Sequence, residues 1–406
     1  MADLHIVFLQ GLPSPFFKRV GQGLTQLGCR VTGINLCVGD QLFWRGVNTI
    51  NYRGRLENWG LFIFEFYAAQ QVTDIVLLGE QRSYHKIAIE LAQARGIRVT
   101  VIDFGYLRPD WITVERDGMG GGSHFPKDPA VIMALASSAP VADLAQRYTD
   151  GFWTMAWGDM HYHFSNLFYF WLFPNYRRPY KRDPPFIHYY SIGKRLFFAS
   201  RKHQAAMVRL VELQVERAQY FLFPLQLEND FQIVSYSPFS GQKEALRLVL
   251  RSFATHASPQ TRLLIKVHPL DPGVENWSRF IAEVADELGI KSRLDYFDGG
   301  NLDDIIITAL GVVTINSTVG LRALQLNRPV MVLGEAIYHV AGLTFQESID
   351  EFWTRAQKPD SVLREAFINV LCHYFQIRGT FYSEPGLSTA VNEMVDHLYH
   401  GRVGIA

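Results

Sequence analysis

The sequence predicts an α/β protein with two Rossmann-like halves, and three observations support this. Short β-branched runs alternate with helical patterns over the first 130 residues, and a second alternating series extends from residue 233 to residue 334. Such alternation is typical of a parallel sheet covered by helices. The chain has 406 residues, of which 48% are hydrophobic. A chain of this length is expected to form more than one domain, each with its own core.

The individual elements follow from these runs. In the first half we expect strands at His5–Leu9, Arg30–Leu36, Asp74–Gly79 and Arg98–Asp103, with helices at Phe17–Leu27, Trp59–Gln70 and His85–Arg95. In the second half we expect strands at Ile233–Pro238, Leu263–Val267, Leu294–Asp298, Gly311–Asn316 and Pro329–Gly334, with helices at Lys243–Ala257, Trp277–Leu288, Leu302–Ala309 and Thr318–Leu326. After Gly334 the pattern is largely helical. The expected segments are therefore a domain at 1–150, an aromatic and basic helical region at 151–222, a second domain at 223–350, and helices at 351–406.

Composition excludes several classes of protein. Lys+Arg and Asp+Glu both number 39, which argues against a dedicated nucleic-acid binder. Three cysteines without metal-ligand spacing fit a reducing cytosol and predict neither a zinc site nor a disulfide framework. The N-terminus has no secretory pattern, and the apolar run Leu167–Phe173 is too short to span a bilayer. We expect a cytoplasmic protein that touches a membrane without crossing it.

The segment from Phe152 to His203 is rich in Tyr, Phe, Trp, Arg and Pro. Its aromatic side chains fit a core of helices that bridges the two halves. They also fit an interfacial patch, because aromatic side chains at headgroup depth are often accompanied by cations that attract anionic lipid. The cations in question are Arg177, Arg178, Lys181 and Arg182. The two interpretations are compatible.

Two motifs in the second half predict an anion site. Lys266 and His268 stand at the carboxyl end of an apolar strand that Pro269 stops, and both side chains can bind a phosphate. His268 is also a catalytic candidate, because it could protonate a departing phosphate oxygen. Fifty residues later, Asn316, Ser317 and Thr318 join a buried strand to a helix, whose start favours anions. Each motif also has a structural interpretation, in which Lys266 and His268 support the fold and the hydroxyls are helix caps. Together they are what clamping a nucleotide phosphate requires.

Carboxylates that can act in catalysis occur in both halves. Asp230 lies among Gln226, Glu228, Asn229 and Gln232, where amides can orient a nucleophile or base, although a polar turn between domains would look the same. In the first half Asp103 ends a strand and is the candidate general acid/base. The candidates for acceptor binding are Gln10, Arg82, Tyr106 and Arg108. Arg108 also fits a structural ion pair.

The motifs that carry a family resemblance occur in order along the chain: GDQLFWRG at 39–46, QRSYHKIAIELA at 81–92, GYLRPDWITVE at 105–115, LQLENDFQI at 225–233, KVHPLDPG at 266–273 and VVTINSTVGLRAL at 312–324. Over residues 4 to 350 the chain resembles capsule polysaccharide biosynthesis proteins of the KpsS/LipB type. The resemblance implies a GT-B-like architecture, in which two Rossmann-like domains face a central cleft, here with an aromatic helical insertion.

The resemblance also implies an activity. Such proteins are retaining β-Kdo glycosyltransferases that use CMP-Kdo as donor and start a Kdo linker on a lyso-phosphatidylglycerol anchor. Carried over to this sequence, Asp230 becomes the nucleophile, and Lys266, His268 and Pro269 bind the CMP phosphate. Asn316, Ser317 and Thr318 then hold phosphate or the sugar carboxylate. No cofactor or metal is expected. The expected partners are a nucleotide sugar, a lipid or glycan acceptor, the cytoplasmic face of the membrane and other capsule proteins.

One departure from the family pattern opens two alternatives. Relatives often have Glu-Glu-Gly where this chain has Asp103-Phe104-Gly105. The replacement of an acidic residue by Phe104 favours a transferase of the same fold with another nucleotide-sugar donor, or a non-catalytic scaffold that binds lipid or glycan. The polar residues Asp230, Lys266, His268 and Ser317 favour the Kdo transferase.

Overall fold

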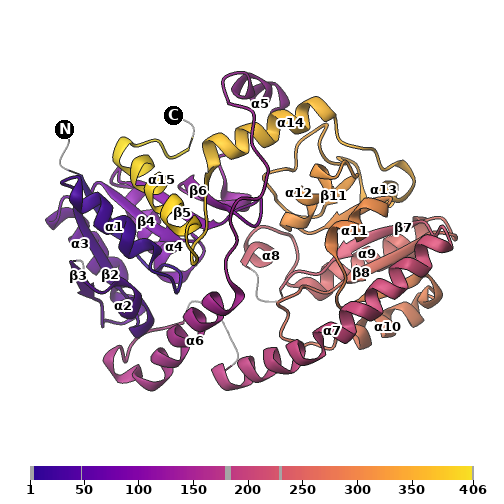
Figure 1. The fold of residues 1–406 in the computed structure, drawn as a ribbon, viewed down its shortest axis with the longest axis horizontal. Coiled ribbons are helices and arrows are strands. Elements are labelled where there is room, and N and C mark those ends of the chain that lie inside the picture. The colour runs from indigo at the N-terminus through magenta and orange to yellow at the C-terminus, as the bar shows by residue number, and fades with distance from the viewer. Residues whose placement is uncertain (1–3, 47, 179–183, 228–230, 405–406) are drawn as a thin grey trace. The chain divides into compact units, whose positions relative to one another are not determined.

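The computed structural model describes residues 4–46, 48–178, 184–227 and 231–404, and the chain forms two α/β units (Figure 1). Unit 1 comprises Met1–Phe125, Ala139–Lys181 and Ile368–Ala406, and unit 2 comprises Pro126–Ser138 and Arg182–Phe367. The predicted α/β class with two Rossmann-like halves is confirmed. The units are discontinuous in sequence, so their boundaries differ from the four consecutive segments expected.

Unit 1 is built on a seven-stranded sheet in the order β12-β6-β5-β4-β1-β2-β3. Its strands are β1 (His5–Phe8), β2 (Arg30–Asn35), β3 (Thr49–Asn51), β4 (Asp74–Leu78), β5 (Arg98–Phe104), β6 (Trp111–Arg116) and β12 (Gln376–Arg378). The first five are parallel, whereas β6 and β12 run antiparallel to their neighbours. The helices of unit 1 are α1 (Phe16–Gln26), α2 (Val38–Trp44), α3 (Trp59–Ala69), α4 (Ser83–Gln93), α6 (Phe152–Phe168) and α15 (Gly386–His400).

Both faces of this sheet are covered, as the side chains of β1 illustrate, because they are all buried but point alternately to the two faces. Ile6 and Phe8 belong to a cluster that contains residues of α1 and α15, whereas Val7 packs on the opposite side with residues of α3 and α4. Successive side chains of a strand point to opposite faces, so a strand covered on both sides is a continuous apolar run. The strand predicted from the apolar run HIVFL is therefore confirmed as β1.

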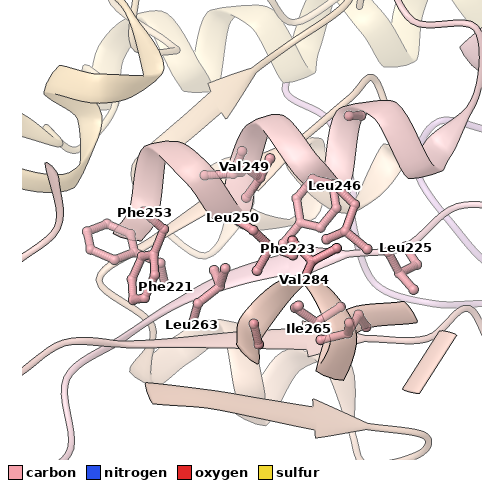
Figure 2. Packing of buried hydrophobic residues seen from close by; sticks show 14 of the residues in the cluster. Phe221, Phe223, Leu225, Leu246, Val249, Leu250, Phe253, Leu263, Ile265 and Val284 are labelled. Atoms are coloured by element: carbon pink, nitrogen blue, oxygen red, sulfur yellow. The ribbon is translucent and has the colours of Figure 1, made fainter. Parts of the chain in front are cut away.

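Unit 2 has a five-stranded parallel sheet in the order β11-β10-β7-β8-β9. Its strands are β7 (Tyr220–Pro224), β8 (Arg262–Lys266), β9 (Leu294–Phe297), β10 (Gly311–Thr314) and β11 (Val330–Val332). The helices of unit 2 are α5 (Pro129–Ala136), α7 (Pro185–Val215), α8 (Phe231–Ser235), α9 (Gln242–His256), α10 (Trp277–Glu287), α11 (Leu302–Thr308), α12 (Thr318–Gln325) and α13 (Ile349–Arg355). Helix α14 (Ser361–Val370) contains the boundary between the units. Figure 2 shows Phe221 and Phe223 of β7 packed with Leu246, Leu250 and Phe253 of α9.

One predicted strand of the second half is wrong. The run Ile233–Pro238 is not a strand, because α8 occupies Phe231–Ser235, and the central strand β7 lies earlier, at Tyr220–Pro224. A short apolar run has no periodicity that distinguishes strand from helix. The chain after Gly334 is largely helical, as expected, and it also contributes the short strand β12, which joins the sheet of unit 1 beside β6.

Candidate functional site

The carboxyl edge of the unit 2 sheet has a topological switch point between β7 and β10. From β7 the chain builds β8 and β9 on one side of the sheet, then returns to form β10 and β11 on the other. In open α/β sheets ligands bind at this position, in the crevice outside the carboxyl ends of the strands. Gln226 lies two residues after β7 and Asn316 two residues after β10. The residues predicted to bind an anion therefore follow the strands at and next to the switch point.

Side-chain amides connect the two loops at the switch point. The Nε2 of Gln226 donates to Oδ1 of Asn316 over 3.0 Å, and the backbone N–H of Asn316 donates to Oε1 of Gln226 over 3.3 Å. The Nδ2 of Asn316 donates to the carbonyls of Gln232 and Tyr236 over 2.7 and 3.3 Å. Because these bonds occupy both ends of its amide, Asn316 holds the loops in place rather than presenting a free polar group.

The two hydroxyls at the start of α12 have different surroundings. Ser317 is the N-cap, and its Oγ accepts from the backbone N–H of Val319 over 3.2 Å. The hydroxyl of Thr318 is partly exposed and has no hydrogen-bond partner among the described residues. Ser317 is thus a helix cap, as the structural interpretation of this motif expected. Thr318 is the residue whose hydroxyl can rotate to bind an anion. Behind them, the Tyr338 hydroxyl donates to the Ser317 carbonyl, and a Cβ at Gly320 would meet that hydroxyl at 2.4 Å.

His268 is half-buried in the turn after β8, and its ring orientation is defined. Its Nδ1 accepts from the backbone N–H of Leu270 over 3.1 Å, which places the proton of the neutral ring on Nε2. Asp271 stabilises the same turn by accepting from the backbone N–H of Gly273 and from Trp277 Nε1 over 2.7 and 3.0 Å. Pro269 is exposed. The turn therefore orients an imidazole whose Nε2–H is the hydrogen-bond donor.

Lys266, at the end of β8, is bonded within the fold. Its side chain is buried, with 5% of the residue exposed, and its Nζ donates to the carbonyl of Gly299 over 2.7 Å. Burial lowers the pKa of Lys266, and the positive charge of Arg195 adds to this. In this structure Lys266 therefore holds the loop after β9, and its contact with a phosphate stays a prediction.

The predicted nucleophile Asp230, together with Glu228 and Asn229, lies outside the described residues. The described neighbours on either side are Gln226 and Gln232, and both bond to Asn316. The side-chain amide of Gln226 and the backbone carbonyl of Gln232 thus belong to the network at the switch point.

In unit 1 a second network of buried polar groups lies at the carboxyl ends of β1 and β2. Gln10, 1% exposed, donates through Nε2 to the hydroxyls of Tyr162 and Tyr176 over 3.0 and 3.1 Å. The Tyr162 hydroxyl donates to Oδ1 of Asp40 over 2.7 Å, and Oδ2 of Asp40 accepts from the backbone N–H groups of Leu36 and Cys37. Gln10 was predicted to bind an acceptor, whereas here its amide donors attach the aromatic segment to the sheet.

Burial dominates the electrostatics of this network. It raises the pKa of Asp40, which the hydrogen bond from Tyr162 and the charge of Arg82 partly oppose. It also raises the pKa of Tyr162 well above its ordinary value. Arg82 is half-buried, and its Nη1 lies 3.5 Å from Oε1 of Gln10. Arg82 and Gln10, two of the residues predicted to bind the acceptor substrate, are thus adjacent.

The residues at the end of β5 divide into buried and accessible groups. Asp103 is half-buried and accepts from the backbone N–H of Phe104 over 2.7 Å. The Tyr106 hydroxyl donates to Glu115 over 2.6 Å and accepts from the backbone N–H of Gly120, so Tyr106 is part of the fold. Arg108 is exposed. Phe104 packs edge-to-face on Phe381 of the C-terminal segment, with ring centroids 5.3 Å apart, so the residue that replaces the expected acid lies against an apolar ring.

The aromatic region fits both interpretations offered for it. Tyr162 and Phe173 are buried, whereas three of the eight tryptophans of the chain, Trp153, Trp157 and Trp171, are more than half exposed. Around them Phe168, Tyr169 and Phe170 are exposed. Arg177 and Arg178 are exposed as well, and Arg177 Nη1 lies 3.5 Å from Glu57 Oε1. Lys181 and Arg182 lie outside the described residues.

The described residues contain neither a metal-binding cluster nor a membrane-spanning helix. No set of three or more His, Cys, Asp or Glu side chains among them is arranged to hold a metal ion. No helix in the described part of the chain has the length and apolar character needed to cross a membrane.

Sequence reasoning missed the residues that support these sites. Gln242 at the start of α9 is fully buried, and its Nε2 donates to the Gln226 carbonyl over 3.0 Å. Asp298, one residue after β9, pairs with Arg195 and Lys202 of α7, at 2.6 Å each. Asp298 had a local signal, because it ends the predicted strand LDYFD. Gln242 had no such signal in the sequence, because only the fold shows that Gln226 is its partner.

The chain is similar in sequence to known proteins. A family model described as capsule polysaccharide biosynthesis protein matches residues 73–382. The chain is 32% identical over 398 residues to the capsule polysaccharide modification protein LipB of Neisseria meningitidis serogroup A / serotype 4A, covering 94% of this chain and 92% of that protein. It is 29% identical over 383 residues to the capsule polysaccharide export protein KpsS of Escherichia coli, covering 93% and 96%.

Among solved structures, KpsC, beta Kdo 2,7 transferase, of Thermosulfurimonas dismutans is 14% identical, with a TM-score of 0.47 over 98% of this chain and 99% of that chain. The family model spans most of the present chain, and the LipB similarity covers nearly all of it. The chain therefore belongs to the capsule polysaccharide biosynthesis protein family.

Proposed function

We propose that this protein is a glycosyltransferase that transfers Kdo from CMP-Kdo, with retention, onto a lipid or glycan acceptor in capsular polysaccharide biosynthesis. The observation that carries the proposal is the switch point of unit 2, where Asn316 and Gln226 join the loops that precede Thr318 and Asp230. The turn with His268 follows the strand next to β7 at the same edge. Family membership supports the sugar and the pathway.

In this proposal unit 2 binds the nucleotide. The Nε2–H of His268 and the hydroxyl of Thr318 donate to the phosphate of CMP, and the start of α12 adds the favourable end of a helix dipole. Lys266, Pro269 and Ser317 lie at the same carboxyl edge of the unit 2 sheet and support the loops that bind the nucleotide. The leaving group is a monophosphate, which such donors can neutralise, so we expect no metal cofactor.

The chemistry is a double displacement. The carboxylate of Asp230 attacks the anomeric carbon of Kdo, the bond to the phosphate oxygen breaks, and CMP leaves with the bonding electrons. An acceptor hydroxyl then attacks the same carbon and releases Asp230, while its proton passes to Asp103 as general base. Arg82 and Arg108 orient the acceptor.

The acceptor we propose is a lyso-phosphatidylglycerol-type lipid, at the cytoplasmic face of the membrane and in company with other capsule proteins. The exposed Trp153, Trp157 and Trp171, together with Arg177 and Arg178, support a surface that contacts lipid. Aromatic rings favour headgroup depth, and each nearby cation adds roughly 1 kcal/mol on an anionic surface.

The proposal is tested by incubating the protein with CMP-Kdo and a short-chain lyso-phosphatidylglycerol and identifying products by mass spectrometry. We expect CMP and a lipid heavier by one or more Kdo residues. In parallel, hydrogen exchange with CMP should protect amides at 266–271 and 316–320. Protection confined to residues 4–125 would refute the nucleotide site.

Phe104 favours two alternatives, since the position where relatives often have an acid packs against Phe381. Turnover of a different nucleotide sugar would identify a transferase with a changed donor. Nucleotide-independent binding of lipid or glycan, without turnover of any CMP-sugar, would identify a scaffold.

A further inference from the structure

The 31-residue helix α7 of unit 2 is attached to its domain by only one face. Its buried residues are Pro185, Ala206, Leu210 and Leu213. On the same face Arg195 and Lys202 pair with Asp298, and Arg209 pairs with Asp295 at 2.9 Å. The three cations are seven residues apart, which places them two turns from one another along one side of a helix. This ionic row and the buried apolar residues on the same side hold α7 against unit 2.

The opposite face of α7 is apolar and exposed. Phe186, Tyr190, Phe197, Val208 and Val215 are between 53% and 79% exposed. Their separations of 4, 7, 11 and 7 residues are close to whole numbers of helical turns, so the side chains form one stripe. The helix is about 46 Å long at 1.5 Å per residue. Single exposed apolar residues need no explanation, but a stripe along a whole helix indicates a binding surface.

Charge identifies the partner. Over its whole length the helix has five Lys or Arg residues and a single acidic residue, Glu212, which pairs with Arg209. Arg195, Lys202 and Arg209 are paired with carboxylates of unit 2, whereas Lys194 and Arg201 are exposed beside the stripe. A second copy of this helix would bring like charges together. A surface of anionic phospholipid complements both the cations and the apolar stripe.

We propose that the exposed face of α7, defined by Phe186, Tyr190, Phe197, Val208 and Val215 with Lys194 and Arg201, docks on an anionic lipid bilayer and lies in its interface. This surface lies on unit 2 and is additional to the aromatic surface of unit 1. It deepens the membrane location proposed above, and it is independent of the identity of the sugar donor.

Vesicle flotation of the full chain tests this inference. We compare phosphatidylcholine vesicles with vesicles that also contain phosphatidylglycerol, without donor or acceptor. Replacing Lys194 and Arg201 by Gln should weaken binding to the anionic vesicles by about 30-fold at low salt, as expected for two interfacial charges. Tyr190→Ser with Phe197→Ser should weaken binding to the same vesicles. The matched control is Leu61→Ser with Val362→Ser, which changes two residues that are 64% and 60% exposed elsewhere and should bind as wild type.

A local probe separates docking of α7 from any other contact with lipid. The native cysteines Cys29, Cys37 and Cys372 are buried, so Phe197→Cys can be labelled selectively with an environment-sensitive dye. We expect a blue shift of its emission with phosphatidylglycerol vesicles. Equal vesicle binding by wild type and the α7 variants would overturn the proposal. A shift that follows protein concentration without lipid would also overturn it, because it indicates self-association. Circular dichroism melting checks folding, and transfer to a soluble short-chain acceptor reports the proposed activity separately.

Discussion

The Tyr162 hydroxyl donates to Asp40 over 2.7 Å, and through this bond α6 is tied to the carboxyl edge of the unit 1 sheet. Gly39 makes the approach possible, because a Cβ at this position would lie 2.4 Å from the Tyr162 ring. The ring covers Asp40 and Gln10, which are both buried. An aromatic segment distant in sequence thus closes the edge at which an acceptor ligand was expected.

Removing this bond should reduce stability. Tyr162→Phe leaves the buried carboxylate of Asp40 with one donor fewer and the buried amide of Gln10 with one acceptor fewer, so we expect the free energy of unfolding to fall by about 1–3 kcal/mol, measured by urea denaturation. Tyr190→Phe removes the hydroxyl of a residue that is 73% exposed and should leave stability unchanged. Equal effects of the two substitutions would contradict the role assigned to Asp40.

The pH dependence of stability should reveal His85. The side chain is fully buried, and its Nδ1 donates to the Gly79 carbonyl over 2.8 Å. Burial, and then the charge of Arg82, lowers the pKa of His85 to about 3. The unfolded chain, with an ordinary pKa near 6.5, therefore binds a proton that the native protein does not, and stability falls as pH decreases from about 6.5 toward 3.

The same residue supplies the control for this pH effect. Between pH 7 and pH 5.5 His85 should account for a loss of about 1 kcal/mol in unfolding free energy. His85→Asn keeps a donor near the position of Nδ1 and does not titrate, so its stability should change less over this interval. An identical pH profile for wild type and variant would show that another group is responsible.

Nucleotide affinity should depend on one nitrogen of His268. His268→Ala should weaken CMP binding by roughly 1.5–3 kcal/mol, the range for a hydrogen bond to a charged group, measured by isothermal titration calorimetry. Gln can place its amide N–H near the position of Nε2, so His268→Gln should retain more affinity than His268→Asn, which mimics Nδ1. Unchanged affinity in all three variants would make His268 a structural residue of its turn.

The strands β1, β4, β8 and β10 were predictable because each is a buried apolar run bounded by polar or turn residues. The residues His268, Asn316 and Thr318 were predictable as site candidates for the same reason, since they follow directly on such runs. The place of β12 was not predictable, because its partner β6 is more than 250 positions away in sequence. The burial of Gln10 depends in the same way on Tyr162 and Tyr176, which no local pattern connects to it.

The final prediction separates the enzyme from the scaffold. Asp230→Asn is nearly isosteric but removes the nucleophilic carboxylate, so CMP affinity and fold should be preserved while transfer of Kdo is abolished. Asp103→Asn removes only proton transfer and should slow the reaction by roughly 10²–10⁴-fold. Single-turnover assays with CMP-Kdo measure both rates, and intact mass spectrometry of wild type should detect a Kdo adduct on Asp230 where the intermediate accumulates.

Gln242→Leu is a useful comparison, because Gln242 supports the Gln226 loop, and its loss should reduce stability and CMP affinity together. Full transfer by Asp230→Asn would remove the nucleophile assignment, and a wild type inactive with every CMP-sugar would favour the scaffold.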